Sequence, residues 1–333
     1  MLNWAGIVLA GLLNGSFAVP IKTARTWKFD HIWMVFSLLA MAVIPWVGVS
    51  LAVPQWSQLL QAVPARGWWG LVALGLLWGV ASLLYGVAVD LLGIALGFAI
   101  QLGLSIVLGA LLPLVWARAL SLRTAQDAFF LGGLALMVVG VVLCAQAGGA
   151  KSAAPGATGA RFRKGLIIAI LGGIGAPLLN FGIQHGISLL RAAGQIPAAA
   201  RFSVNMYVAW AVFLSAAAVT QSGYCLLRIL VTRSGAAFRS PGSGRDAGLV
   251  VGMSVVWAAS VCFYGMSAAG LGRLGTSFGW PVFIALIILT SNAWGVILGE
   301  WKGAGRSAFQ RMLLGSAVLV LASFLIGHGQ AGS

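Results

Sequence analysis

The chain has 333 residues, of which 60% are hydrophobic and only 8% are charged, and its mean hydropathy is +1.00. This composition excludes an ordinary water-soluble domain and predicts a protein of the lipid bilayer. The net charge of +15 would suggest nucleic-acid binding in a soluble protein, but these cations fall in short segments between apolar runs. There they set topology and contact anionic lipid headgroups, so lipid is the expected partner and nucleic acid is not.

Ten apolar runs follow one another along the chain, and each has about the 20 residues that a helix needs to cross a bilayer. They fall at about residues 3–21, 31–53, 67–89, 93–116, 128–147, 165–189, 201–222, 248–269, 275–299 and 309–327. The first run lacks a preceding basic region, which favours a retained span over a cleaved signal peptide. The expected fold class is therefore an all-α integral membrane protein with ten transmembrane helices.

Residues 1–333 are expected to form one membrane domain made of two groups of five helices. The first group covers residues 1–147, a linker covers residues 148–164, and the second group covers residues 165–328. A second segment rich in Gly, Ser and Ala, residues 232–247, joins the seventh and eighth helices. Neither segment has an apolar period, so both are expected to be flexible and solvated.

The cations are unevenly distributed between the two sides of the predicted membrane. Of the 20 Lys and Arg, 14 fall after odd-numbered helices and six after even-numbered helices. By the positive-inside rule, the loops after odd-numbered helices are cytoplasmic and both termini lie on the opposite side.

One aromatic pattern occurs in both the third and the eighth expected helix. WGVASLLYG (residues 78–86) and WAASVCFYG (residues 257–265) carry Trp, Tyr and Gly at the same spacing, and GSFAVP (residues 15–20) weakly matches GGIGAP (residues 172–177). Because the copies are five helices apart, which is an odd number, the second half enters the membrane in the opposite direction, as in the inverted repeats of alternating-access carriers. Trp, Tyr and Gly are also common in membrane helices, so a chance match is the alternative.

Three longer stretches are familiar: KTARTWKFDHIWMVFSLLAMAVIPW, GLLWGVASLLYGVAVDLLGIALGFAIQLGLSIVLG and WGVILGEWKGAGR. Together they resemble the L-rhamnose/proton symporter family of the drug/metabolite transporter superfamily, over nearly the whole chain. The resemblance implies ten helices in two inverted five-helix repeats, a location in the bacterial inner membrane, and import of a deoxyhexose with a proton. In that membrane, the termini that the cation count places opposite the cytoplasm are periplasmic. The sequence departs from the expected pattern at residues 275–286, GTSFGWPVFIAL, which contain no ionisable group.

A neutral sugar offers hydroxyl groups to amides and a C–H face to aromatic rings, so its site should combine both kinds of side chain. The sixth helix has the clearest polar stripe, which begins at Pro177 and ends at Arg191. The expected substrate-binding residues are Asn180, Gln184, Gln101, Trp78, Trp257, Trp280 and Asn14. Weaker candidates are Asn205, Asn292, Tyr85 and Tyr264. Hydrogen bonding between helices is the alternative for the amides, and packing is the alternative for the rings.

Proton coupling requires a group that can change its charge inside the membrane. The candidates are His185 beside the polar stripe, Asp90 at the end of the third helix and Glu300 at the end of the ninth. Each also has a structural alternative: a neutral hydrogen bond, a helix-end turn or a surface ion pair. The remaining acids, Asp30, Asp127 and Asp246, are expected in loops.

No cofactor or metal is expected. Cys144, Cys225 and Cys262 lie inside apolar runs without a second ligand cluster, so they are interpreted as packing residues.

The predicted function is a secondary active transporter that imports a small neutral sugar with protons, with L-rhamnose favoured by the resemblance. A carrier of another sugar or neutral metabolite, or a channel, stays open; an intramembrane enzyme would need catalytic clusters that the sequence lacks. The sequence does not indicate an oligomeric state.

Overall fold

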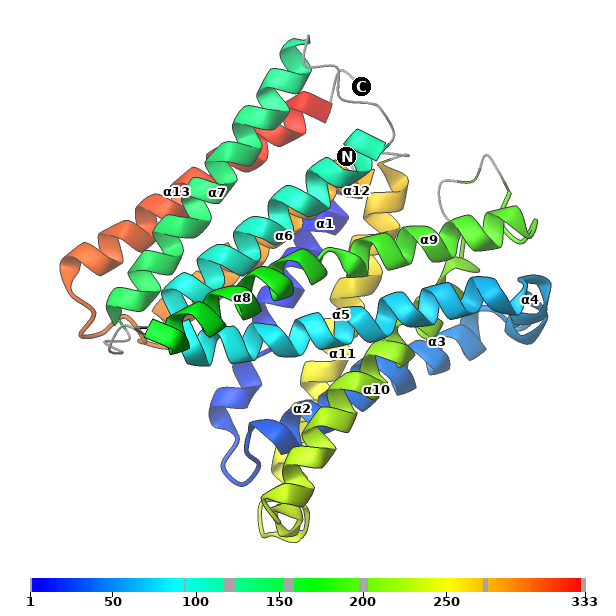
Figure 1. The fold of residues 1–333 in the computed structure, drawn as a ribbon, viewed down its shortest axis with the longest axis horizontal. Helices are drawn as coiled ribbons and strands as arrows, with labels where there is room; N and C mark the ends of the chain where they lie inside the picture. Colours follow the sequence, from blue (N-terminus) through cyan, green and yellow to red (C-terminus); the bar gives the residue numbers. More distant parts are fainter. Residues whose placement is uncertain are drawn as a thin grey trace. The chain divides into compact units, whose positions relative to one another are not determined.

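The structure is a computed structural model that describes residues 2–92, 94–116, 124–151, 159–197, 200, 203–271 and 275–330 (Figure 1). Every regular element in these ranges is helical, which confirms the all-α class. In the first half the elements are α1 (Leu2–Ser16), η1 (Val19–Thr23), α2 (Phe29–Leu38), η2 (Leu39–Val43), α3 (Ile44–Ala52), α4 (Trp56–Ala62), α5 (Ala65–Leu92), α6 (Ile94–Trp116) and α7 (Ala125–Lys151). In the second half they are α8 (Gly159–Gly175), α9 (Leu178–Ala192), α10 (Met206–Val231), η3 (Gly235–Arg239), α11 (Ser243–Gly270), α12 (Gly275–Ile297) and α13 (Arg306–Gln330).

Eight helical stretches among the described residues are long and apolar enough to cross a membrane. They are Phe29–Ala52, Ala65–Ala88, Ala125–Ala150, Ala160–Ala192, Met206–Val231, Ser243–Gly270, Ser277–Ile297 and Arg306–His328. The other two expected spans correspond to α1, which has 15 residues, and to α6, whose apolar part is the shorter stretch Ala99–Val115. The chain is thus a multi-pass helical membrane protein.

The sixth expected helix is interrupted where its proline predicts a bend. The helix α8 ends at Gly175 and α9 begins at Leu178, so Pro177 lies in the break. Proline has no backbone N–H to donate and its ring crowds the preceding turn, which explains the interruption.

The seventh helix begins and ends later than expected. It runs from Met206 to Val231, so Asn205 precedes the helix, and its amide donates to the carbonyl of Gln195 at 2.7 Å. Asn205 is thus the N-cap residue of this helix and does not lie inside it.

The chain forms two compact units, and each takes residues from both sequence halves. Unit 1 contains Met1–Gly15, Ala81–Pro177 and Met266–Ser333, and unit 2 contains Ser16–Val80 and Leu178–Gly265. The division falls within α5 and within α11, so both helices contribute to each unit.

Within unit 1, α7 and α13 lie side by side along much of their length (Figure 1). Glycines face each other across this contact: a Cβ placed on Gly315 would meet the Gly140 carbonyl at 2.9 Å, and one on Gly140 would meet the Gly315 carbonyl at 3.1 Å. Small residues let membrane helices approach until their backbones touch, and here the approach is reciprocal.

Within unit 2, α2 and α3 are linked to α10 by side-chain hydrogen bonds. The Trp33 indole donates to Gln221 Oε1 at 2.9 Å, and Trp46 donates to Ser215 Oγ at 2.9 Å. Gln221 is fully buried, and no sequence pattern singled it out. Such bonds hold helices together where water is absent.

The segment after α10 differs from the solvated linker expected at residues 232–247. It contains η3 and the first turn of α11, where Asp246 is only 1% exposed. The Asp246 carboxylate accepts N–H groups from Thr26 at 2.7 Å, Trp27 at 2.9 Å and Arg25 at 3.2 Å. A buried carboxylate needs such donors, so this acid ties the two segments together and is not a loop residue.

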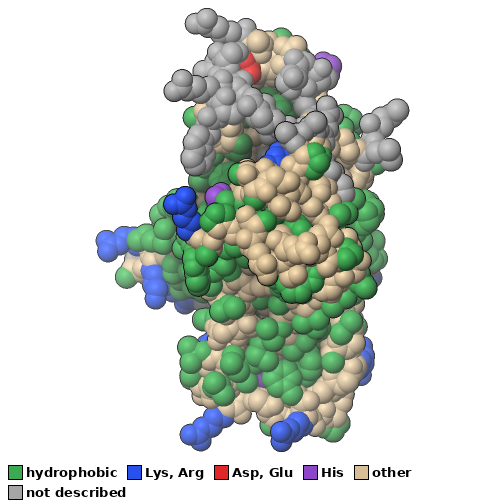
Figure 2. All heavy atoms as spheres, turned by 90° about the vertical axis from the view of Figure 1, so that its right-hand side faces the viewer, with side chains coloured by type: hydrophobic (Ala, Val, Ile, Leu, Met, Phe, Trp, Pro, Cys, Tyr) green, Lys and Arg blue, Asp and Glu red, His purple; other side chains and the backbone are tan. Residues whose placement is uncertain are grey.

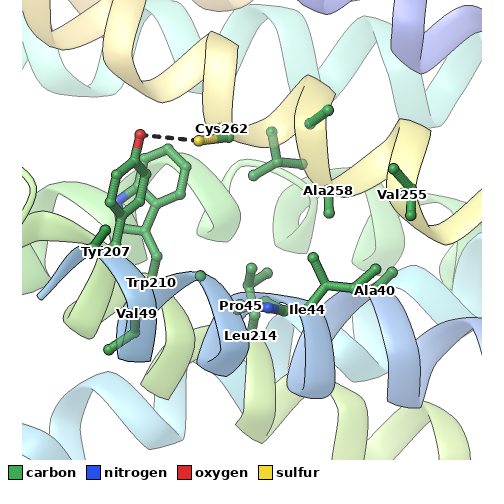
Figure 3. A pocket seen from close by; sticks show the side chains of 14 residues that line it. Ala40, Ile44, Pro45, Val49, Tyr207, Trp210, Leu214, Val255, Ala258 and Cys262 are labelled. Atoms are coloured by element: carbon green, nitrogen blue, oxygen red, sulfur yellow. Dashed lines mark hydrogen bonds between the residues drawn. The ribbon is translucent and has the colours of Figure 1, made fainter.

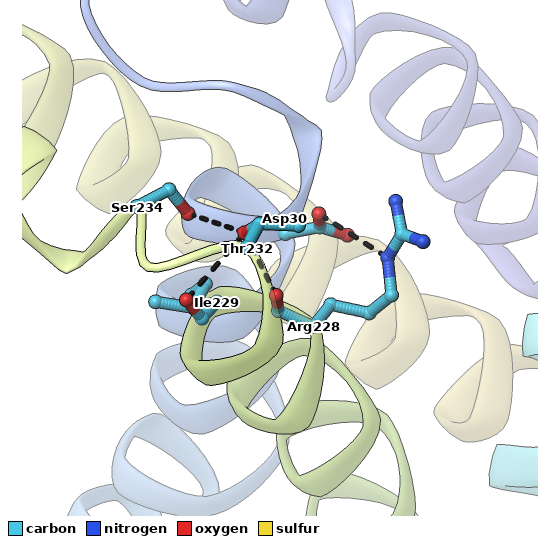
Figure 4. A network of polar contacts seen from close by, with 5 residues as sticks. All are labelled: Asp30, Arg228, Ile229, Thr232 and Ser234. Carbon is cyan, nitrogen blue, oxygen red and sulfur yellow. Dashed lines mark hydrogen bonds and ion pairs between the residues drawn. The ribbon is translucent and has the colours of Figure 1, made fainter.

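A second polar network lies at the same end of unit 2 (Figure 4). Arg228 Nε lies 3.6 Å from Asp30 Oδ2, and Thr232 Oγ1 donates to the Arg228 carbonyl at 2.8 Å. The Arg228 side chain is 54% exposed, so this ion pair belongs to the surface.

Candidate functional site

Unit 1 contains a cavity of about 200 Å³ whose lining includes several polar side chains. These are Tyr85 from α5, Cys144 from α7, Ser291 and Asn292 from α12, and Trp301 from the segment after α12; aliphatic residues complete the wall. Pockets for drug-sized ligands measure about 300–1,000 Å³, so this space suits a smaller molecule. Hydroxyl, amide and indole groups on an aliphatic wall match the chemistry expected for a neutral sugar.

The Asn292 amide occupies the centre of a short polar chain. Its Nδ2 donates to Ser316 Oγ at 3.3 Å and to Cys144 Sγ at 3.5 Å. The neighbouring Ser291 hydroxyl donates to the carbonyl of Gly15 at 3.3 Å. These bonds fix the amide between α7, α12 and α13, and therefore orient its carbonyl oxygen.

Glu300 is the chain neighbour of a residue that lines this cavity, although it does not line the cavity itself. It precedes the lining residue Trp301, and its backbone N–H donates to the Gly295 carbonyl at 2.9 Å. A Cβ placed on Gly295 would lie 3.6 Å from Glu300 Oε2, and Glu300 Oε1 is shielded from solvent. The carboxylate thus packs over α12, about one helical turn beyond Asn292.

Gln101 and Trp280, two of the predicted binding residues, lie elsewhere in unit 1. Gln101 is 2% exposed, it packs against Gly172 of α8, and neither atom of its amide has a hydrogen-bond partner among the described residues. The Trp280 indole donates to the Ser105 carbonyl at 3.0 Å, and its ring fills the space beside Gly109. Asn14, on α1, is partly exposed.

Asn180 and Tyr264 meet inside unit 2. Asn180 is fully buried, and its Oδ1 accepts the Tyr264 hydroxyl at 3.1 Å, which links α9 to α11. Its Nδ2 has no partner among the described residues.

The two tryptophans of the repeated pattern pack in unit 2 in a crossed manner. The Trp78 ring on α5 lies 5.9 Å from Phe213 on α10, and the Trp257 ring on α11 lies 5.7 Å from Phe36 on α2. Each pair joins a helix of one sequence half to a helix of the other.

The remaining predicted residues on α9 lie at the surface of unit 2. Gln184 is partly exposed, and His185 is exposed, with its Nε2 3.5 Å from the position of a Cβ on Gly70. The polar stripe is therefore buried at Asn180, near its beginning, and exposed at Arg191, where it ends. Asp90, the third coupling candidate, has its side chain outside the described part of the structure.

Unit 2 has its own cavity, of about 390 Å³, between α2 to α3, α10 and α11 (Figure 3). Its lining is mainly aliphatic, and the polar side chains that it includes are Tyr207, Trp210 and Cys262. The Cys262 thiol donates to the Tyr207 hydroxyl at 3.0 Å. This cavity offers a sugar few hydrogen-bonding groups.

Of the polar residues that line the unit 1 cavity, the sequence predicts only Tyr85 and Asn292, and it predicts both as weaker candidates. Cys144 was interpreted as a packing residue, but it also accepts the Asn292 amide. Ser291 and Trp301 belonged to no pattern; the available signal was the GEWKGAGR segment that carries the family resemblance.

Long apolar helices with polar groups buried among them define a multi-pass membrane protein of the transporter kind. Residues 4–332 match the family model described as L-rhamnose-proton symport protein (RhaT), so the chain belongs to that family. The resemblance of the sequence to this family is thereby confirmed. The family consists of symporters, so the chain is a transporter rather than an enzyme.

Curated relatives cover nearly the whole chain. It is similar to the L-rhamnose-proton symporter of Cronobacter sakazakii, with 25% identity over 95% of this chain and 93% of the relative. The L-rhamnose-proton symporter of Mannheimia succiniciproducens is also 25% identical, over 95% and 94% of the two chains. That of Klebsiella pneumoniae is 24% identical, again over 95% and 94%.

Proposed function

We propose that this protein imports L-rhamnose together with protons across the bacterial inner membrane. The observation that carries the proposal is the family match over residues 4–332, supported by relatives with that name along nearly their full length. A neutral sugar also suits the unit 1 cavity, where hydroxyl, amide and indole groups lie on an aliphatic wall.

We further propose that ten helices form two inverted five-helix repeats and carry the sugar by alternating access, as in the drug/metabolite transporter superfamily. The crossed ring pairs support this arrangement. If α2 corresponds to α10 and α5 to α11, then Trp78 with Phe213 and Trp257 with Phe36 are equivalent contacts. The reciprocal approach of Gly140 and Gly315 likewise supports a twofold relation between α7 and α13.

The proposed sugar site is the unit 1 cavity, with Asn292, Ser291 and Tyr85 as hydrogen-bonding groups and Trp301 as a ring on its wall. Gln101 is a second proposed contact, because its buried amide lacks a partner among the described residues. Of the other predicted residues, Trp78, Trp257, Trp280 and Asn180 have structural contacts, and they remain predictions together with Gln184 and Asn14.

Glu300 is the proposed coupling group. It adjoins the cavity through Trp301, and a carboxylate can take up and release a proton as the sugar binds and leaves. His185 on the exposed side of α9, and Asp90, are the alternatives.

The proposed sidedness places the loops after odd-numbered helices in the cytoplasm and both termini in the periplasm. Two of these segments, which follow the first and seventh expected helices, meet at one end of unit 2 through Asp246. Figure 2 shows Lys and Arg side chains at the lower end of the view, and others at mid-height on its left. Basic residues of both segments at one end of unit 2 support a cytoplasmic position for that end.

The test is uptake of labelled L-rhamnose into proteoliposomes. We expect accumulation when an inward proton gradient is imposed, and only slow equilibration when a protonophore dissipates the gradient. Uptake that does not depend on the proton gradient would contradict symport. If there is no uptake of L-rhamnose and another neutral sugar raises the thermal stability of the protein, that other sugar becomes the proposed substrate. This follows because a ligand stabilises the folded state to which it binds.

A further inference from the structure

The larger cavity, in unit 2, has no role in the proposed sugar path. It measures about 390 Å³, within the range of ligand pockets, and it lies between the α2 to α3 segment, α10 and α11 (Figure 3).

The cavity exists because small residues face each other across it. Ala40, Gly48 and Ala52 lie on one side, and Ala258 and Ala259 of α11 lie on the other. The backbone of the first wall is also irregular, since η2 is a π-helix and Pro45 follows it near the start of α3. A π-helical turn widens a helix locally and is often found at functional sites, while proline removes a backbone donor.

The lining is apolar almost throughout. The Tyr207 hydroxyl already accepts the Cys262 thiol, and the remaining polar atom, Trp210 Nε1, is a buried donor without an acceptor among the described residues. A sugar bound here would leave most of its hydroxyl groups without partners, which costs about 1–3 kcal/mol for each buried group. A hydrocarbon chain has no hydrogen-bonding groups and therefore does not incur this cost.

The mouth of the cavity opens on a lipid-facing surface. Gly48, Ala52 and Val255 line the cavity and are exposed at the same time. Next to them, Leu51 is 81% exposed and Val47 is 53% exposed, on a helix long and apolar enough to span the membrane. The hydrocarbon of the bilayer is therefore continuous with the cavity lining.

We propose that the unit 2 cavity binds one acyl chain of a bilayer phospholipid, inserted between α3 and α11. The acyl chain fills an apolar space in which water would lack hydrogen-bond partners. It packs against the alanine and glycine residues of the cavity wall. Bound lipid then supports the contact of α3 and α10 with α11.

The test is photolabelling of the full-length protein in vesicles of phosphatidylethanolamine and phosphatidylglycerol. A small fraction of the phosphatidylethanolamine carries a diazirine in its acyl chain, and mass spectrometry locates the label. Val261 is 3% exposed, so label on Val261 requires that a chain enters the cavity; Cys262, which is partly exposed, lines the cavity beside it. We expect label at both positions, in addition to the general label on exposed residues such as Leu51.

Two variants fill the cavity from opposite sides, Gly48→Leu and Ala258→Leu. Gly223→Leu on α10 is the matched control, because a Cβ on either Gly48 or Gly223 meets nothing within 4 Å and Gly223 does not line the cavity. We expect both filling variants to reduce the label at Val261 several-fold and the control to leave it unchanged. Unchanged label in both filling variants would overturn the proposal. Loss of label on addition of L-rhamnose would also overturn it, since the cavity would then belong to the sugar.

Discussion

The carboxylate of Asp246 connects two segments of unit 2 that are far apart in the sequence. It is buried, it accepts N–H groups from three consecutive residues, and it fixes the segment before α2 to the start of α11. The neighbouring Gly, Ser and Arg residues are typical of a solvated linker, so the composition of this segment does not predict a buried carboxylate. A single side chain here determines where two helices begin relative to each other.

Replacement of Asp246 by Ala should destabilise the protein by at least about 2 kcal/mol, because buried N–H groups lose their acceptor. Thermal unfolding in detergent measures the change. Asp30→Ala is the control at the same end of unit 2, since it removes only the exposed ion pair with Arg228 and should cost at most about 1 kcal/mol. Equal effects of the two substitutions would contradict the structural role of Asp246.

Asn292 tests the proposed sugar site. Asn292→Ala removes a half-buried hydrogen-bonding group worth about 1–3 kcal/mol, so we expect L-rhamnose to bind roughly 5- to 150-fold more weakly. Concentration-dependent thermal stabilisation or uptake kinetics would measure the affinity. Asn205→Ala is the control, because its amide bonds a loop carbonyl in unit 2. An affinity unchanged in the Asn292 variant would exclude the cavity as the site.

Glu300 tests the coupling proposal. Glu300→Gln keeps the size of the side chain but cannot exchange a proton, so we expect loss of gradient-driven accumulation while exchange of labelled for unlabelled L-rhamnose persists. The same assay on His185→Ala should show normal accumulation, since that ring is exposed on α9. The reverse pattern would move the coupling function to His185.

At the scale of elements, apolar run length predicted the helices well because a bilayer leaves a long apolar segment little choice except helix. The ends were less predictable. The helix α10 continues to Val231, nine residues beyond its expected end, and the basic Arg228 within this extension reaches Asp30 at the surface. The π-helix η2 had no signal in the sequence.

The site was less predictable than the helices. Tyr85, Cys144 and Asn292 come from α5, α7 and α12, so their meeting depends on how three helices pack. Hydropathy and periodicity describe one helix at a time and cannot rank such combinations. This is why Asn292 was named but placed below residues such as Trp280, which proved to donate to a backbone carbonyl.

The close contact of α7 with α13 gives a prediction for an element. Gly315→Leu would force a side chain against Cys144 and the Gly140 backbone, where a Cβ already comes within 2.7–2.9 Å. Overpacking of this kind costs about 1–3 kcal/mol, or more where backbone must move. Gly132→Leu on the partner helix α7 is the control, because a Cβ there meets nothing within 4 Å. Comparable thermal stability of the two variants would contradict the packing.

At the scale of the whole molecule, the even number of proposed spans places both termini on one side of the membrane. Fusions at the C-terminus test this prediction: alkaline phosphatase should be active and green fluorescent protein dark if the terminus is periplasmic. Fusions after Lys302 should give the opposite result, because this cation follows an odd-numbered helix. A fluorescent C-terminal fusion would contradict the proposed orientation, and with an external N-terminus it would contradict ten spans.

The crossed contacts of Trp78 with Phe213 and of Trp257 with Phe36 have a consequence for how the chain is assembled. A polypeptide cut between Lys151 and Gly159 would leave each compact unit divided between two fragments. Neither fragment could then bury its aromatic rings alone, yet the two made together hold complementary surfaces. Two separately translated fragments should therefore reconstitute a working carrier.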